Sequence, residues 1–470
     1  MGDIVAAETE LPGIPIEDRP SSPTAVSRRR ALTVGLVLVV TLAAFEALAV
    51  ATILPSARRD LGGVRLYGWA FSAFLLMSLV GIIWAGQQSD RHGPARPFLA
   101  GTALFGVGLV VAGLAPEMWV LIAGRAIQGL GAGVIPAVAY VAIGRGYSDA
   151  ERPRMFAILS TAWVLPGLIG PAVAAVAAEA SSWRVVFLGL VPLLIVAVTL
   201  ALPALRTLGV PPASSGSEVR PRVMDAVRLA SGAAFVLAGL TAANVWLTGP
   251  LVLGGILWAA PALKRLLPVG TLRGAPGLPA AIAGMGLLNF AFFGADAYIP
   301  YALTEIRGQS TFVVGAVLTA TTLTWTIGSW TVERTAGRIA RPPIIVLGIC
   351  IIVAGLAGVT VTIVTDVPIF IAIVAWGIGG LGMGMAYPSF SLTVLTHTNS
   401  GSEGATTSAL KLFETLGGAL GTGLGGAIVA AGAAANHDRP AISTLFAVMA
   451  TVALVGIIAA RRSASNVAAG

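Results

Sequence analysis

The sequence predicts an all-α integral membrane protein that crosses the bilayer fourteen times, and three observations lead to this fold class. Of the 470 residues, 56% are hydrophobic and only 11% are charged, whereas a soluble domain carries about 25% charged residues. Apolar runs of about 20 residues, the length that spans a bilayer as a helix, recur between residues 31 and 460. Basic residues gather between alternate runs, as they do in cytoplasmic loops.

The predicted spans follow one another between charged or Gly/Pro-containing turns. In chain order they are residues 31–55, 67–87, 98–116, 118–143, 155–178, 184–205, 229–247, 250–263, 278–303, 311–331, 343–364, 367–396, 404–432 and 440–460. The pair within 229–263 is the weakest prediction, because it is one uncharged stretch divided only by Gly249-Pro250. Its second half is short for a span.

Charge placement decides how residues 229–263 cross the membrane. With two crossings there, 21 of the 29 Lys and Arg residues fall in cytoplasmic segments, including the tails at 1–30 and 461–470. A single crossing would place the arginines of the second half outside, against the usual bias. We therefore expect a plasma-membrane protein with both termini in the cytoplasm. The net charge of +8 then reflects membrane topology and needs no nucleic-acid partner.

Residues that support metal or nucleophilic chemistry are scarce. The single cysteine, Cys350, lies in an apolar run, and the three histidines are far apart in predicted loops. We expect no intramolecular disulfide, no metal site and no enzymatic activity. No segment resembles the phosphate-binding pattern G-x-x-x-x-G-K-[ST]. An ion gradient, without a cofactor, is therefore the expected energy source.

One positive charge lies inside an apolar run, at Arg125 within residues 121–143. A guanidinium keeps its charge, so its burial in a bilayer is costly unless it faces a polar cavity or a partner. Glu46 and Asp296 lie at a similar depth in other runs, and a carboxyl there suits reversible protonation because its ionised form is penalised. We expect Arg125 to pair with or tune one of them; the alternative is a purely architectural hydrogen-bonding role.

A glycine-rich pattern occurs twice in the chain. QGLGAGVIP at 128–136 recurs as GGLGMGMAYP at 379–388, with the glycines 251 residues apart. Two six-helix halves separated by a two-helix insert would produce this spacing. Lys411 and Glu414, three residues apart near the cytoplasmic side of a late span, are predicted to form a structural ion pair.

Motifs in the N-terminal half follow a fixed order. Arg125, Gln128 and Gly129 match l-x-x-x-R-x-x-q-G-x-g in the fourth span. In the fifth span, PGLIGPAVAA retains Gly170 and Pro171 of g-x-x-x-G-P-x-x-G-G. FEALAVATILP at 45–55 lines up with l-D-x-T-x-x-n-v-A-l-P, with glutamate in place of aspartate, and SSWRVVF at 181–187 begins the sixth span.

The loop GQQSDRHGPAR resembles the signature G-x-x-x-D-R-x-G-R-[RK]. Its matching residues are Gly86, Asp90, Arg91 and Gly93, with Arg96 displaced from its usual position. Together these five motifs resemble those of the major facilitator superfamily, in particular its fourteen-span drug:proton antiporters, and the resemblance covers nearly the whole chain.

The resemblance implies two six-helix bundles, at 31–205 and 278–460, joined by a linker at 206–277 that carries the two-span insert. It implies a monomeric exporter of drugs or other lipophilic small molecules that exchanges them for protons by alternating access, with a role in antibiotic resistance. Glu46, Asp296 and Arg125 would then couple transport to protons. The loop at 86–96 would gate the cytoplasmic side.

The resemblance also implies motif or hinge positions, which are Gln128, Gly129, Gly170 and Pro171. Two other functions stay open: an exporter or symporter of a specific metabolite in the same family, and a non-transporting membrane scaffold. The charge of the substrate is also open. Buried carboxyls suit cations, whereas Arg125 and Lys411 suit anions or zwitterions.

Overall fold

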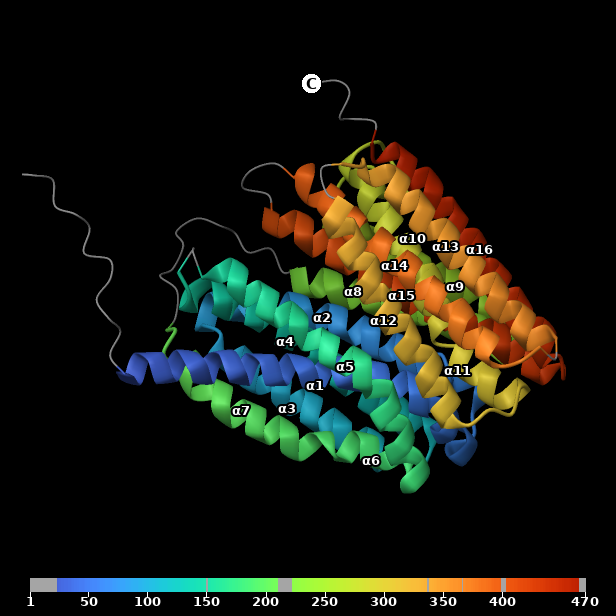
Figure 1. Ribbon diagram of the computed structural model, residues 1–470, viewed down its shortest axis with the longest axis horizontal. Coiled ribbons are helices and arrows are strands. Elements are labelled where there is room, and N and C mark those ends of the chain that lie inside the picture. Colours follow the sequence, from blue (N-terminus) through green and yellow to red (C-terminus); the bar gives the residue numbers. More distant parts are fainter. Residues whose placement is uncertain are drawn as a thin grey trace, which may run out of the picture.

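The computed structural model describes residues 23–148, 151–209, 222–335, 338–365, 367–398 and 403–464. Every regular element within these ranges is a helix. Fourteen helical segments are long and apolar enough to cross a membrane, which confirms the predicted all-α membrane fold. The helices form two bundles, blue to green and yellow to red in Figure 1.

The N-terminal bundle contains six spans, the last of them made of two helices in sequence. Its elements are α1 (Pro23–Leu61), η1 (Val64–Leu66), α2 (Trp69–His92), α3 (Ala95–Gly113), α4 (Met118–Gly146), α5 (Arg152–Ala180), α6 (Trp183–Leu188) and α7 (Leu190–Arg206).

The C-terminal bundle also contains six spans, the first of which ends in a π-helical turn. Its elements are η2 (Thr271–Arg273), α10 (Leu278–Asp296), α11 (Ile299–Tyr301), η3 (Ala302–Ile306), α12 (Thr311–Thr335), α13 (Arg341–Val364), α14 (Phe370–Thr396), α15 (Glu403–Ala434) and α16 (Asp438–Arg462).

The insert between the bundles is a pair of helices, α8 (Arg222–Thr241) and α9 (Val245–Leu266), and both are candidate spans. The predicted break at Gly249-Pro250 is wrong, because α9 continues through Pro250. The chain turns instead just before Asn244, whose side chain accepts a hydrogen bond from the backbone N–H of Trp246 (3.0 Å). This N-cap starts α9 early enough to give it 22 residues, sufficient for a span.

Glycines bring the backbone of α4 directly against α2. A Cβ atom at Gly129 would lie 2.1 Å from the carbonyl oxygen of Phe74, and one at Gly133 would lie 2.0 Å from that of Ser78. Both separations are far below van der Waals contact. Only glycine fits at these positions, as is common where membrane helices pack closely.

The same contact recurs between α14 and α12. A Cβ atom at Gly380 would lie 2.2 Å from the carbonyl oxygen of Thr321, and one at Gly384 would lie 2.1 Å from that of Trp325. These glycines follow their counterparts on α4 by 251 residues, and the facing carbonyls follow theirs by 247. The sequence repeat is therefore a repeat of helix packing.

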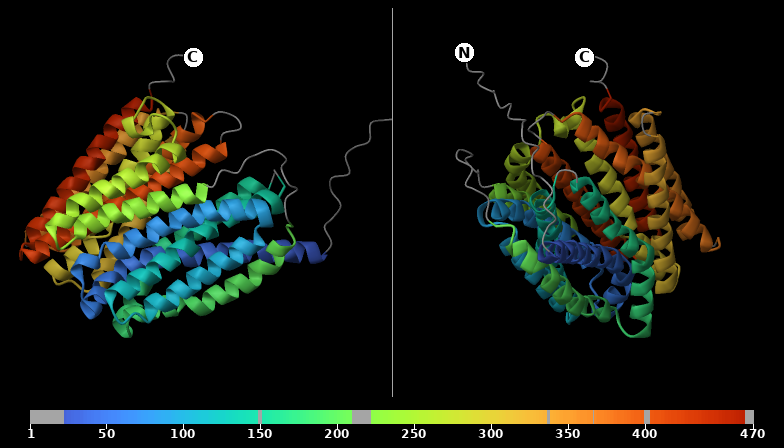
Figure 2. Two further views of the ribbon diagram at one scale, coloured as in Figure 1. Left: turned by 180° about the vertical axis from the view of Figure 1, so that it is seen from behind. Right: turned by 60° about the vertical axis from the view of Figure 1, so that its left-hand side comes forward.

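The two bundles meet at the end that holds the α1–α2 turn. Tyr67 OH donates to the carbonyl oxygen of Ala297 (3.2 Å), and its ring lies 5.4 Å from that of Tyr298. Ser72 Oγ of α2 donates to the carbonyl oxygen of Ala419 on α15 (2.9 Å). The left view of Figure 2 shows the bundles converging here and diverging toward the opposite end. By the predicted topology, the closed end faces outside.

Candidate functional site

Arg125 lies where α1, α2 and α4 meet, and its side chain is only 2% exposed. Its guanidinium forms an ion pair with Glu46 of α1 through Nη1 and Oε1. Nε donates to the carbonyl oxygen of Ala70 on α2 (3.1 Å), and Nη1 donates to Oε1 of Gln128 one turn along α4 (3.0 Å). The guanidinium carbon also lies 4.1 Å from the centre of the Phe74 ring, a cation–π contact.

The carboxyl group of Glu46 is only partly satisfied in this site. Its side chain is 1% exposed, and Oε2 has no hydrogen-bond partner among the described residues. A buried ionised oxygen without a partner is costly. The ion pair with Arg125 is therefore the contact that compensates the charge of Glu46 in this site.

Helix packing explains how Arg125 reaches three helices at once. Beside it, a Cβ atom at Gly124 would lie 2.6 Å from the backbone nitrogen of Ala112 on α3. Gly129, four residues after Arg125, touches α2 as described above. These contacts hold α4 so close to α2 that the Arg125 side chain can bond the Ala70 carbonyl. The glycine pattern thus positions the charge.

Asp296 lies at the end of α10 in the other bundle and does not meet Arg125. Its Oδ1 accepts a hydrogen bond from Nε1 of Trp376 on α14 (2.8 Å). Trp376 follows Arg125 by 251 residues and Asp296 follows Glu46 by 250. The two bundles therefore hold equivalent pairs between equivalent helices. One is an ion pair, and the other is a hydrogen bond between a neutral donor and a carboxyl.

Gly170 and Pro171 of α5 lie between Glu46's helix and the other bundle. Gly170 is not the point of closest helix approach, because an added Cβ there would meet the Phe45 ring at 3.5 Å, an ordinary contact. The tight approach is made by Gly315 of α12, whose Cβ position lies 3.0 Å from the carbonyl oxygen of Pro171. The motif thus contributes a backbone surface against which α12 packs.

The loop at residues 86–96 lies at the end where the bundles diverge. Asp90 is exposed and lies 3.9 Å from Arg145 of α4, in its own bundle. Gly93 adopts a left-handed φ of 75° that ends α2, while a Cβ at Gly86 would meet nothing within 4 Å. Within the described residues, Asp90, Arg91 and Arg96 make no ion pair with the C-terminal bundle. Arg96 lines a surface pocket of about 230 Å³.

Lys411 and Glu414 of α15 form an ion pair, with Nζ 2.9 Å from Oε1. Sequence reasoning gave no role to their third partner, Tyr387 of α14. Its OH donates to Glu414 Oε2 (3.0 Å) and accepts from Lys411 Nζ (3.3 Å). Tyr387 stands in the second copy of the glycine pattern, one residue before the proline, and this was its only sequence signal.

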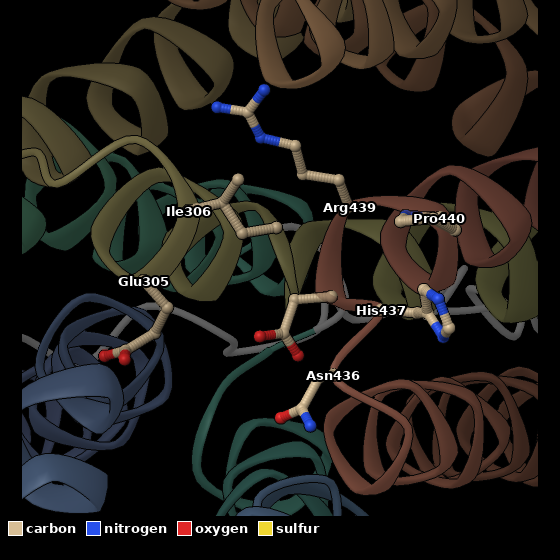
Figure 3. A pocket seen from close by; sticks show the side chains of 7 residues that line it. Glu305, Ile306, Asn436, His437, Arg439 and Pro440 are labelled. Carbon is tan, nitrogen blue, oxygen red and sulfur yellow. The ribbon is translucent and has the colours of Figure 1, made fainter.

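A second ionic contact, which the sequence did not reveal, closes the opposite end. Arg58 and Arg59 of α1 contact the carboxylate of Glu305 at 2.6 and 3.2 Å. Glu305 lies in the π-helical turn η3, which widens the end of the first span of the C-terminal bundle. Glu305 also lines a pocket of about 370 Å³, together with His437 and neighbouring residues of the α15–α16 turn (Figure 3).

Comparisons with known proteins agree with this architecture. The profile described as Major Facilitator Superfamily matches residues 36–422. A probable multidrug-efflux transporter of Mycobacterium tuberculosis is 28% identical over 432 residues, covering 87% of this chain and 89% of the relative. The multidrug transporter protein MdtP of Bacillus subtilis is 25% identical over 415 residues, covering 86% and 76%.

The fold is also found among solved structures. The xylose transporter XylE of E. coli, in a partially occluded inward-open conformation, superposes with a TM-score of 0.62. It is 14% identical, and the match covers 91% of this chain and 97% of that one. At this identity the similarity concerns the fold alone.

Proposed function

Given that the chain belongs to the major facilitator superfamily, we propose that this fourteen-span transporter exports lipophilic small molecules across the plasma membrane in exchange for protons. The names of its relatives support drugs as cargo, since two similar proteins are described as a multidrug-efflux and a multidrug transporter. The protein is a membrane transporter and not an enzyme.

The observation that carries the proposal is the buried Glu46–Arg125 pair. When Glu46 takes up a proton, Arg125 keeps its charge and loses its counter-ion in a site from which solvent is excluded. An uncompensated buried charge destabilises the conformation that holds it. Protonation therefore favours a conformation in which the site is opened to polar surroundings. Release of the proton on the other side restores the pair and the original conformation.

This mechanism needs the carboxyl of Glu46 and the fixed charge of Arg125 together. Gln128 would help to keep the guanidinium oriented, because its Oε1 also accepts a hydrogen bond from Nη1. Asp296, in the equivalent position of the other bundle, is the second candidate proton site. Its partner is the neutral indole of Trp376, so its protonation strands no charge.

Transport measurements in proteoliposomes test the proposal. With an imposed pH gradient, the wild-type protein should accumulate a fluorescent drug against its concentration gradient. Glu46→Gln should still equilibrate the drug but should no longer accumulate it, and Arg125→Ala should lose active transport while remaining folded. Asp296→Asn shows whether the second carboxyl contributes. If both Glu46→Gln and Asp296→Asn pump normally under the pH gradient, coupling through these residues is wrong.

A susceptibility panel separates the proposed cargo from the alternatives. Cells that express the protein should survive higher concentrations of several unrelated lipophilic drugs and dyes than cells that express Arg125→Ala. Protection against a single metabolite would favour the metabolite exporter. A scaffold would be favoured by two results together. No compound would be transported, and cells would show the same phenotype with a variant neutralised at Glu46, Arg125 and Asp296 as with the wild type.

A further inference from the structure

We propose that Lys411, Tyr387 and Glu414 form a subsite that binds the anionic group of amphipathic aromatic substrates, with Trp325 and Phe293 as the wall for the aromatic body. The proposal rests on the transport of lipophilic small molecules argued above. The motifs do not specify the chemistry of the substrate. The proposal specifies it as an aromatic ring system that carries a carboxylate.

Lys411 carries its charge within a membrane span. It lies inside the candidate span Ala405–Ala434, and its side chain is 47% exposed. Ionisable side chains inside spans face the bundle interior or a water-filled path, because exposure to lipid tails is costly. A half-exposed ammonium in this position therefore indicates a polar path.

The stripe of α15 that carries Lys411 faces the other bundle. Lys411, Glu414, Gly418 and Thr422 are spaced by three, four and four residues, so they lie on one helix face. The far end of this stripe touches α2, because Thr422 Oγ1 lies 3.0 Å from Ser72 Oγ.

One turn nearer to the ion pair, the stripe still touches α2. A Cβ at Gly418 would lie 3.4 Å from Leu75 Cδ1. Further along, the bundles diverge (Figure 2). Lys411 and Glu414 thus continue this helix face toward the end at which the bundles diverge, where the proposed function requires the cargo to enter.

The hydrogen-bond pattern of the cluster determines which charge it presents. Both oxygens of Glu414 are satisfied, Oε1 by Lys411 and Oε2 by the OH of Tyr387. The ammonium of Lys411 uses two of its three donors, on Glu414 and Tyr387, and retains the third. Lys411 is also the more exposed partner, at 47% against 15% for Glu414. The cluster therefore offers a positive group with a free donor, which suits a carboxylate.

An aromatic surface adjoins this charge. The Tyr387 ring lies 5.9 Å from the Trp325 ring, and Trp325 lies 6.3 Å from Phe293. Trp325 and Phe293 are half-buried, and Phe293 reaches α15, 3.9 Å from the Cβ position of Gly418. Such rings provide flat apolar area beside a polar anchor, as in many small-molecule sites.

Equilibrium binding to the purified full-length protein in nanodiscs tests the subsite with three matched probes: 2-naphthylacetate, its methyl ester and 2-(2-naphthyl)ethylamine. The wild-type protein should bind the carboxylate roughly tenfold more tightly than the ester, the range expected for one charge-assisted hydrogen bond. Lys411→Met should abolish this preference and leave ester binding unchanged. Lys264→Met, which neutralises the only other lysine of the chain, should behave as the wild type.

Exchange of the two charges provides the decisive control. The double variant Lys411→Glu, Glu414→Lys still has an ion pair between positions three residues apart. If the pair had only a structural role, this variant would bind the three probes as the wild-type protein does. The subsite predicts that this variant prefers the amine to the carboxylate. Equal binding of carboxylate and ester by the wild type, or an unchanged preference in Lys411→Met, overturns the proposal.

The outcomes are separable from those of the proposed function. Loss of the carboxylate preference would leave proton-driven export of a cationic dye intact in the transport assay. Conversely, failure of proton coupling at Glu46 would leave the binding preference and its dependence on Lys411 unchanged. Gel filtration and thermal unfolding of each variant establish that it is folded before its binding is compared.

Discussion

At the residue scale, the two partners of the buried ion pair differ in their charge once the other partner is removed. Arg125 keeps its charge at any accessible pH, whereas Glu46 can become neutral by taking up a proton. Both side chains are almost fully buried. The loss of one partner is therefore not equivalent to the loss of the other.

We expect Glu46→Gln to destabilise the protein more than Arg125→Gln. The first variant strands a guanidinium, at a cost of about 3–5 kcal/mol. The second variant leaves Glu46 without its partner. The folded protein can accommodate the protonated carboxyl, whereas ionisation of this buried group costs free energy. Since the folded state of Arg125→Gln then binds more protons than the unfolded state, its stability should fall as pH rises. Thermal unfolding in detergent across a pH series checks both the order and the sign.

A matched double variant serves as the control for this pair. Glu46→Gln combined with Arg125→Gln removes both charges, so it should be more stable than Glu46→Gln alone and should lose the extra pH dependence. Equal destabilisation by the two single variants at all pH values would show that the pair is not held as a buried ionic contact.

Sequence reasoning identified the buried charges but could not assign the pair. Counting residues along each span placed Glu46, Asp296 and Arg125 at comparable depth. Depth says nothing about which bundle a side chain faces, and that depends on helix packing. Glu305 was missed for a different reason: it contacts Arg58 from the π-helical turn at 302–306, a feature without a local sequence pattern.

At the scale of the helix, individual glycines have unequal importance. We expect Gly129→Ala to weaken folding severely, because the added methyl would lie 2.1 Å from the Phe74 carbonyl oxygen, a backbone atom that cannot move aside. Gly170→Ala should be tolerated, since its methyl makes an ordinary contact, and Gly86→Ala should be neutral because nothing lies within 4 Å. The yield of monodisperse protein and its thermal unfolding temperature measure the order.

The equivalence of the two bundles adds an internal control to this series. Gly380→Ala, which meets the Thr321 carbonyl oxygen at 2.2 Å, should resemble Gly129→Ala in its effect. A mild phenotype for both would mean that α2 and α4, and their counterparts α12 and α14, are not in backbone contact.

The turn between α8 and α9 allows a direct test of the insert. With Cys350 replaced by serine, a single cysteine at Ala243, an exposed residue of this turn, should react with a membrane-impermeant maleimide added to intact cells. A cysteine at Arg273, beyond the end of α9, should react only after the cells are opened. The reverse pattern, or equal labelling of both, would exclude two crossings in the predicted orientation.

The order and number of spans could be predicted because each depends on local composition. The boundary inside the insert could not. Gly249-Pro250 is the stronger breaker in sequence, yet the helix start is set by the Asn244 cap, and Pro250 is accommodated near the beginning of α9. A capping hydrogen bond depends on backbone geometry that a single asparagine does not reveal.

At the scale of the whole molecule, the structure shows a transporter closed at its predicted outer end. Tyr67 and Ser72 seal the contact between bundles through backbone carbonyls, and the Arg58–Glu305 pair lies at its edge. Opening to the outside must break these contacts. Their strength therefore sets the balance between the two faces of the transport cycle.

We expect Glu305→Gln to shift this balance toward the outward-open state. The variant removes the charge shared by Arg58 and Arg59 and leaves the deeper tyrosine contacts in place. Spin labels at Glu117 and Arg439, both exposed and in different bundles, should report longer distances in the variant than in the wild type. As a control, Asp225→Gln removes an ion pair within the insert, with Arg265, and should leave the distances unchanged.

The equivalence of the Glu46–Arg125 and Asp296–Trp376 pairs also bears on the history of the molecule. The 251-residue repeat exceeds one bundle by roughly the stretch from Arg206 to Leu278 that holds α8 and α9, as duplication of a six-helix ancestor followed by insertion would produce. The glycines in backbone contact are the same in both copies, whereas the pair between the first and fourth helix differs from one copy to the other. In the proposed mechanism, protonation of Glu46 leaves Arg125 without its counter-ion, whereas protonation of Asp296 leaves no charge unpaired, because its partner Trp376 is neutral. A duplication of this kind would place two carboxyls in the same architectural position, each with a different partner.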